Sequence, residues 1–149
     1  MRIAFQIWRA GPGDAARVLA ADVFDAPATA EATARFLGTS GLADPRNILL
    51  VADLDGRAVG FVSGTVMDHP DKPRGLFVQE LGVNEAAQRR GIARALLAAL
   101  RAEGRALGCS ATWVLTEADN AAARATYAAT GATETTGVVL YEWTEAAAR

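Results

Sequence analysis

The sequence predicts an α+β domain built on one mixed sheet with helices on both faces. Three strand-like segments, 47–54, 57–67 and 75–83, follow one another through short turns, which favours antiparallel pairing between neighbours. A strand–helix–strand unit follows, formed by 75–83, 87–107 and 111–116, and its two strands need a parallel arrangement. Both patterns in one chain predict a mixed sheet, with the elements in the order β-α-α-β-β-β-α-β-α-β.

The first part of the chain predicts one strand and two helices. Residues 2–9 alternate apolar and polar side chains, as a strand does. Asp14 can cap a helix that runs through about Phe24. Pro27 interrupts this pattern, and residues 28–38 resume it as a second helix.

The middle of the chain predicts a hairpin followed by a third strand. Residues 47–54 form a continuous apolar run, as expected of a strand covered on both faces. Asp55-Gly56 is a strong signal for a two-residue turn, so residues 57–67 should be the partner strand. Residues 68–73 contain two prolines and are expected to be irregular, and residues 75–83 form the next strand.

The last part of the chain predicts two helices and further strands. Residues 87–107 place leucines on one side and arginines on another, which predicts an amphipathic helix that Gly108 ends. A strand at 111–116 and a helix at 120–130 should follow. Residues 133–143 are expected to form a final strand or a hairpin.

Composition narrows the class of protein. The 149 residues suit one domain, 1–149, and the formal net charge of -2 argues against a nucleic-acid partner. No segment approaches the roughly 18 apolar residues of a membrane span. The single cysteine, Cys109, excludes an internal disulfide, which agrees with a cytoplasmic protein. Cys109 is expected to be a small buried residue rather than a nucleophile, and with His69 it cannot supply a zinc ligand set, so no metal is expected.

The stretch from Gln88 to Ala93 carries the first chemical signal. A glycine, Gly91, is expected inside the first turn of a helix that starts at Ala87. Free amides at such a helix start attract anions, and the missing Cβ lets a phosphate approach the backbone. Arg89 and Arg90 add positive charge beside it. The alternative interpretation is an ordinary amphipathic helix whose first turn carries solvated arginines and binds no anion.

Gln88-Arg89-Arg90-Gly91-Ile92-Ala93 resembles the pyrophosphate loop of the GCN5-related N-acetyltransferases (GNAT), written Gln/Arg-x-x-Gly-x-Gly/Ala. Downstream, Asn120 opens a helix and Tyr127 follows seven residues later, which is similar to the second cofactor segment of that family. The resemblance implies a mostly antiparallel sheet of six or seven strands with helices on both faces. It also implies an acetyl-coenzyme A-dependent N-acetyltransferase that uses no metal.

The resemblance implies a role for each cofactor residue. Main-chain amides would hold the coenzyme A pyrophosphate at Gln88, Arg89, Arg90, Gly91, Ile92 and Ala93. The main chain of Leu81, Gly82 and Val83 would bond the pantetheine arm, and an N–H near Val83 would polarise the thioester carbonyl. Asn120 would touch the pantetheine or the adenine end. Tyr127 would protonate the leaving thiolate, whereas a tyrosine packed on the sheet with a hydrated hydroxyl is the alternative.

Glu80 is the candidate general base. Strand alternation places Glu80 on one face with Leu76, Val78 and Gly82. A carboxylate among apolar neighbours is costly unless it is paired or used, and partial burial would make it a better proton acceptor. In the family, a carboxylate at this strand position often deprotonates the amine. An ion pair with Arg74 is the structural alternative.

Within the family the chain is most similar to the aminoglycoside 3-N-acetyltransferases, in residues 22–25, 66–74, 80–83 and 138–143. The resemblance implies a small polycationic amine as acceptor and antibiotic resistance as the consequence. Glu80 and Glu142 stand where the subfamily would have Asp, and each adds a methylene to the reach. The residues expected to bind the acceptor are Asp22, Asp25, Asp68, His69 and Glu142, with Glu31, Asp71 and Glu145 also bordering the cleft.

Other acceptors and other classes stay open from the sequence. A transferase of this fold could act on a peptide α-amine, a polyamine or another small amine. A non-catalytic acyl-coenzyme A sensor would bind the cofactor without transferring its acetyl group, and an interaction domain would bind no cofactor. A homodimer is common in the family, and the segment around Trp143 could contribute to it.

Overall fold

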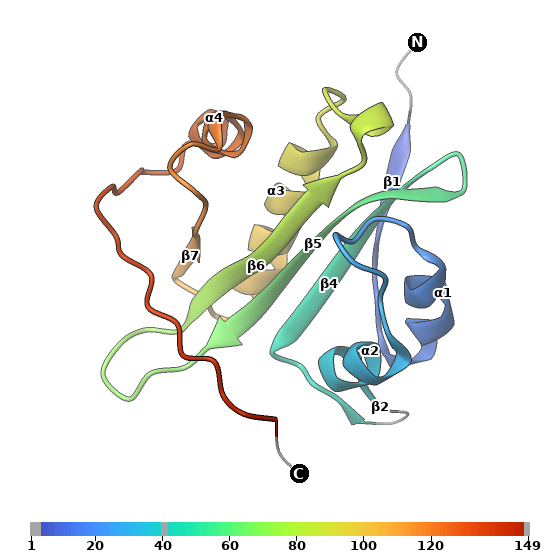
Figure 1. Ribbon diagram of the computed structural model, residues 1–149, viewed down its shortest axis with the longest axis horizontal. Helices are drawn as coiled ribbons and strands as arrows, with labels where there is room; N and C mark the ends of the chain where they lie inside the picture. The colour runs from blue at the N-terminus through green and yellow to red at the C-terminus, as the bar shows by residue number, and fades with distance from the viewer. Residues whose placement is uncertain (1–3, 40–41, 148–149) are drawn as a thin grey trace. The chain divides into compact units, whose positions relative to one another are not determined.

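The computed structural model describes residues 4–39 and 42–147. These residues belong to two compact units, Met1–Leu115 and Thr116–Arg149, each of which is described by itself. The first unit contains a five-stranded sheet in the order β1-β4-β5-β6-β7 (Figure 1). Its pairs are antiparallel except for β6 and β7, so the prediction of a mixed, mostly antiparallel sheet is confirmed. The strands are β1 (Phe5–Arg9), β4 (Asn47–Leu54), β5 (Arg57–Met67), β6 (Gly75–Val83) and β7 (Ala111–Val114).

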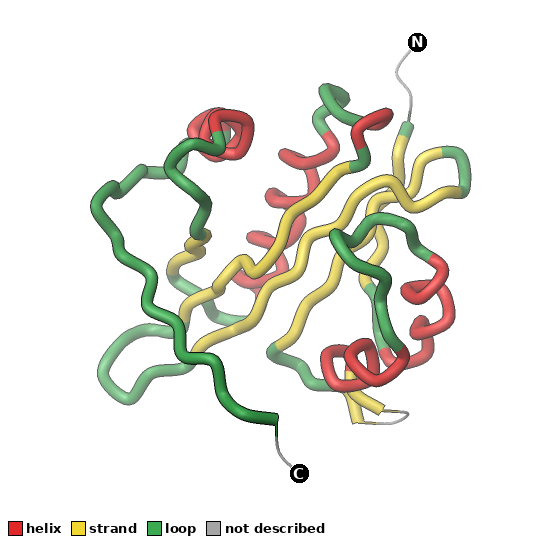
Figure 2. The backbone as a smooth tube through the Cα atoms, viewed as in Figure 1, coloured by secondary structure: helices red, strands yellow, loops and turns green. Residues whose placement is uncertain are grey.

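Helices cover both faces of this sheet, as predicted (Figure 2). Helices α1 (Ala15–Ala20) and α2 (Ala30–Leu37) lie on one face and α3 (Ile92–Ala106) lies on the other. The remaining elements of the unit are the 3-10 turns η1 (Pro12–Asp14) and η2 (Glu85–Ala87), and a two-stranded ribbon of β2 (Gly38–Thr39) and β3 (Leu42–Ala43). None of the helices described combines the length and apolar character that a membrane crossing requires.

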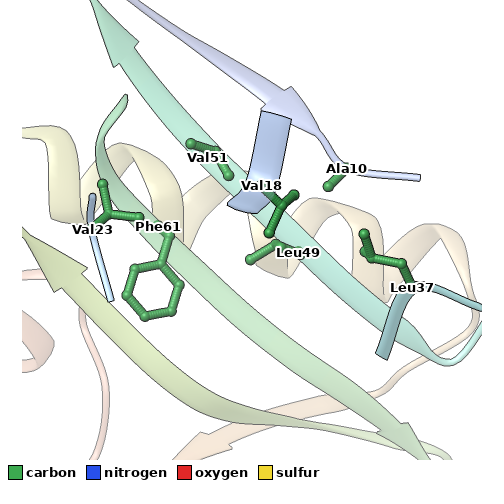
Figure 3. Packing of buried hydrophobic residues seen from close by; sticks show 7 residues of the cluster. All are labelled: Ala10, Val18, Val23, Leu37, Leu49, Val51 and Phe61. Carbon is green, nitrogen blue, oxygen red and sulfur yellow. The ribbon is translucent and has the colours of Figure 1, made fainter. Parts of the chain in front are cut away.

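Each face of the sheet buries its own apolar layer. Figure 3 shows Val18 and Leu37 from the helical segments directed toward Leu49, Val51 and Phe61 on β4 and β5. On the opposite face α3 approaches the sheet so closely that a Cβ on Gly104 would lie 2.8 Å from Leu76 Cδ2. Glycine at position 104 therefore removes a side chain where the helix meets β6.

The central hairpin follows the sequence pattern closely. Asp55 and Gly56 both have positive φ, 53° and 78°, as a two-residue type I′ turn requires. The bounds of β4, β5 and β6 agree with the predicted strands at 47–54, 57–67 and 75–83. These three strands form the centre of the sheet, so the local pattern was sufficient to place them.

The first predicted helix ends earlier than expected. Helix α1 stops at Ala20 rather than near Phe24, because Ala21 is extended at φ −77° and ψ 118°. The chain then carries Val23 into the apolar layer beside Phe61, where only 8% of Val23 is exposed. Burial against the sheet overrides local helix propensity in this segment.

Helix α3 begins later than expected. It starts at Ile92 rather than Ala87, because residues 85–87 form the separate turn η2 and Arg89 adopts a left-handed φ of 64°. Gly91, at φ 78°, is therefore the N-cap of α3 and does not lie inside its first turn. The predicted end is confirmed, since Gly108 has a φ of 86° just beyond the helix.

The second unit contains helix α4 (Ala121–Ala129) and an extended C-terminal segment. Helix α4 agrees with the predicted helix, and Gly131 follows it at φ 83°. The predicted strand or hairpin at 133–143 is wrong for the described residues, and Val138, Tyr141 and Trp143 are 65%, 75% and 81% exposed. A strand-prone sequence still needs a hydrogen-bonded neighbour, so the main sheet has five strands instead of six or seven.

Candidate active site

A β-bulge in β6 sets the direction of Glu80. Ser63 of β5 pairs with Glu80 and Gly64 pairs with Val78, so Gln79 is an extra residue on β6. Leu76, before the bulge, packs against α3, whereas a Cβ on Gly82, after it, would lie 3.1 Å from the Phe61 ring on the other face. The prediction that Leu76, Val78, Glu80 and Gly82 share one face is therefore wrong, because the extra residue reverses the alternation.

Glu80 is an exposed carboxylate rather than the partly buried one expected. Its predicted alternative, an ion pair with Arg74, does not form. Arg74 instead donates two hydrogen bonds to Asp68, at 2.7 and 3.1 Å, and a third to the Leu107 carbonyl oxygen at 2.9 Å. Within the described residues Glu80 has no salt-bridge partner, so its charge is available to a ligand.

Glu80 lines a pocket of about 240 Å³ on the α1 and α2 face of the sheet. The polar lining residues are Thr29, Thr33, Ser63, Gln79 and Glu80. The large apolar ones are Val18, Phe24, Phe36, Leu37, Leu49 and Phe61. Gln79 and Glu80 both reach this pocket because the bulge turns two successive residues toward the same face. The pocket therefore combines an apolar wall with a single carboxylate.

The carboxyl half of β6 extends beyond its neighbour. Parallel pairing with β7 ends at Val78 and Val114, whereas β6 continues to Val83. The main chain of Leu81, Gly82 and Val83 thus passes the end of β7, which is the edge that the predicted pantetheine contact requires. Gln88 Nε2 donates to the Val83 carbonyl oxygen at 3.1 Å and holds the following loop against the strand end.

The loop between η2 and α3 forms a compact positive site. Arg89 and Gly91 are both left-handed, so the main chain turns sharply before α3. The first helical bond runs from Ala95 N to Gly91 O at 3.0 Å, and Gln88 N already donates to Glu85 O at 3.2 Å. The amides of residues 89–94 are therefore the ones left for a ligand. Arg89, Arg90 and Arg94 are exposed and form no salt bridge with the described residues.

This loop fits a diphosphate. A Cβ built on Gly91 would meet no atom within 4 Å, so open space adjoins the backbone at the helix start. Free amides and the partial positive charge of the helix terminus favour an anion there, and the arginines strengthen the field. The pyrophosphate-binding role of residues 88–93 stays a prediction, and the amide of Gln88 is already bonded to Glu85 O.

The two residues of the second unit that were predicted to contact the cofactor belong to α4 and its N-cap. Asn120 is its N-cap, and Asn120 Oδ1 accepts a hydrogen bond from Ala123 N at 3.0 Å. Tyr127 follows by seven residues, close to two helical turns, so both side chains share one face of α4. Burial raises the pKa of the Tyr127 hydroxyl. Tyr127 is therefore a protonated phenol near neutral pH, as a proton donor must be.

The predicted acceptor residues fall in different places. Asp22 and Asp25 are exposed and flank Phe24, which lines the pocket that contains Glu80. Asp68 and His69 do not line it. The charge of Asp68 is already compensated by Arg74, whose hydrogen bonds and positive charge lower the pKa of the Asp68 carboxyl. Glu142 is exposed in the second unit.

Sequence reasoning missed Asn84, which joins the segment between α1 and α2 to the end of β6. Asn84 Nδ2 donates to the Asp22 carbonyl oxygen at 3.0 Å, and Asn84 N donates to Val59 O at 2.8 Å. The hydrogen bond from Asn84 to Asp22 holds the segment between α1 and α2 against the end of β6, beside η2. An asparagine directly after a strand was the available signal, since its side chain commonly bonds to nearby main chain.

Cys109 takes no part in this site. It is buried, and burial raises the pKa of its thiol, so the reactive thiolate is disfavoured. This agrees with the prediction of a small buried residue. Within the described residues no three His, Cys, Asp or Glu side chains gather as a metal centre would require.

Comparison with known proteins identifies the fold. The family model described as the Acetyltransferase (GNAT) family matches residues 14–132. Among solved structures, an aminoglycoside acetyltransferase from an uncultured soil metagenomic sample has a TM-score of 0.78 at 22% identity, covering 96% of this chain and 99% of that one. The aminoglycoside N-acetyltransferase AAC(6')-Iy, in complex with coenzyme A, has a TM-score of 0.73 at 21% identity, covering 93% and 99%.

A solved structure whose name gives a different acceptor has a similar TM-score. The ribosomal-protein-alanine N-acetyltransferase from Brucella melitensis biovar Abortus has a TM-score of 0.70 at 22% identity, covering 95% of this chain and all of that one, 100%. A search among proteins of curated function finds no match to the sequence. At these identities the structural likeness establishes the fold, which is shared by proteins with unlike acceptors.

Proposed function

The chain belongs to the GNAT acetyltransferase family, and we propose on this premise that it moves the acetyl group of acetyl-coenzyme A directly to a primary amine. The observation that carries the proposal is the loop at 88–91. A diphosphate site at the start of α3 is supported by the left-handed Arg89 and Gly91 and by the open space beside Gly91. The loop arginines, which have no salt bridge within the described residues, support it as well. The family match crosses the boundary between the two units, which supports one acetyltransferase domain over residues 1–149.

In the proposed reaction each group of the chain has one task. Acetyl-coenzyme A supplies the thioester carbonyl that the amine attacks. The amides of residues 89–94 hold the diphosphate, and an N–H near Val83 polarises the carbonyl. Glu80 takes the proton of the amine, directly or through one water, and Tyr127 donates its proton to the departing sulfur. Because both reactants are bound, positioning supplies much of the acceleration.

The proposed acceptor is an aminoglycoside, modified at its 3-N position, with antibiotic resistance as the consequence. Exposed Asp22 and Asp25, which flank the pocket residue Phe24, support a cationic acceptor, because carboxylates attract ammonium groups. The names of the structural relatives support the same class. A reaction that consumes acetyl-coenzyme A also supports a cytoplasmic location.

A panel assay tests this proposal. Coenzyme A release is followed with aminoglycosides, polyamines and peptides that carry a free α-amine, and calorimetry measures coenzyme A binding in parallel. We expect release with aminoglycosides, and NMR of the product separates 3-N from 6′-N transfer. Release with peptides alone would leave an acetyltransferase with another acceptor. Binding without transfer would indicate a sensor, and absence of coenzyme A binding would contradict the proposal.

Replacing Tyr127 with phenylalanine is expected to lower kcat by about 100-fold, because the leaving thiolate loses its proton donor. The ring and its packing are kept, so the Kd for coenzyme A should change less than about twofold. Stopped-flow kinetics and calorimetry measure the two quantities. Tyr141→Phe is the matched control, because Tyr141 is exposed in the C-terminal segment. A Tyr127→Phe enzyme with unaltered kcat would show that another group protonates the sulfur.

A further inference from the structure

The pocket beside Glu80 has an apolar floor and a polar rim. Val18, Leu49 and Phe61 line it and are 2%, 5% and 4% exposed, so they form an apolar inner surface. Gln79 and Glu80 line the same pocket and are exposed, which places their polar ends at its opening. A ligand that fills this pocket must present apolar atoms to the floor and a polar group to the rim.

The size of the pocket suits a ring with a short linker. A cavity of about 150 Å³ lined by aliphatic and aromatic side chains accepts benzene. The pocket here is about 240 Å³, which leaves room for a ring and two further carbons. Phe24 and Phe61, with ring centroids 4.6 Å apart at 60°, offer aromatic surfaces that another ring can contact.

The single negative charge of the pocket favours a ligand that carries one ammonium group. Glu80 is the sole carboxylate among the lining residues. A ligand with several ammonium groups could neutralise one of them at Glu80, and any other placed inside would meet apolar walls at a high desolvation cost. A ligand with one ammonium avoids that cost, because its charge stays at the rim.

We propose that this pocket binds a primary monoamine carried on an aromatic or branched alkyl group, which makes such amines a second class of acceptor. The inference rests on the proposed function, because Glu80 is the base in that reaction. The amine nitrogen lies at Glu80 and the apolar group lies on the floor between α2 and the β4–β5 strands. Aminoglycosides, in contrast, would place only the reacting amine at Glu80 and their other ammonium groups at Asp22 and Asp25 outside the pocket.

Two amines of similar basicity test the apolar contact. The value of kcat/KM for 2-phenylethylamine is expected to exceed that for 2-methoxyethylamine by at least about 30-fold, because only the first buries a ring. Ala32→Leu should remove most of this preference, since Ala32 lines the pocket on α2. Ala30→Leu is the matched control, because Ala30 is exposed on the same helix and does not line the pocket.

A binding measurement separates this inference from the catalytic one. Calorimetry of 2-phenylethylamine with the whole protein is expected to give saturable binding that Ala32→Leu weakens at least about tenfold and Ala30→Leu leaves unaltered. Binding without acetyl transfer to any amine would keep the pocket assignment and overturn the proposed function. Two results would overturn the pocket assignment alone, provided that aminoglycosides are acetylated. The first is an equal kcat/KM for the two test amines, and the second is the absence of saturable binding of 2-phenylethylamine.

Discussion

Replacing Gly91 with alanine is expected to weaken coenzyme A binding at least about 30-fold. Gly91 is the left-handed N-cap of α3, where a Cβ enters the open space that a phosphate oxygen would occupy. Loss of one or two charge-assisted bonds to the diphosphate, each worth about 1.5–3 kcal/mol, produces an effect of this size. Calorimetry with coenzyme A measures the change in Kd directly.

Gly108 supplies the control for backbone strain. It has a φ of 86° at the other end of α3, and a Cβ there would also meet no atom within 4 Å. Gly91→Ala and Gly108→Ala should therefore destabilise the fold by a similar amount, about 1 kcal/mol in urea unfolding. Only the first should lose cofactor affinity. Equal coenzyme A affinity in the two variants would contradict a diphosphate site at this turn.

The central strands could be predicted because their signals are local. Residues 47–54 are an apolar run, and Asp55-Gly56 is a turn sequence that needs no distant partner and implies a partner strand at 57–67. The position of the loop at residues 88–93 was predictable for the same reason, since these residues carry a short motif between a strand and a helix, and their cofactor role stays a prediction. Its conformation was not predictable, because a left-handed arginine at position 89 contradicts ordinary residue preference.

The direction of Glu80 depends on a distant pairing. Alternation along β6 predicts its neighbours only while the register is regular, and the register shifts where Ser63 and Gly64 of β5 meet residues 78–80. The same limit explains the early end of α1, which is set by the burial of Val23 on the sheet. It also explains residues 133–143, whose strand propensity lacks a described partner.

Replacing Glu80 with glutamine is expected to lower kcat by about 100- to 1,000-fold at neutral pH, because no carboxylate then takes the proton of the substrate amine. Glutamine keeps the size and exposure of the side chain, so coenzyme A affinity should be retained. The remaining rate should rise with pH, since only an amine that arrives deprotonated can react. Steady-state kinetics across the pH range measure both effects, and Glu103→Gln is the control, because Glu103 lies on α3 in an exposed pair with Arg9.

The bulge permits a sharper test of the same role. Gln79 and Glu80 line one pocket, so a Gln79→Glu, Glu80→Gln double variant keeps a carboxylate on that face and moves it by one residue. A base needs hydrogen-bond reach of the amine, so the double variant should recover only a small part of the lost kcat. A carboxylate that merely attracts cations acts over a longer distance, and full recovery would assign Glu80 that role instead. The size of the recovery therefore separates proton transfer from electrostatic attraction.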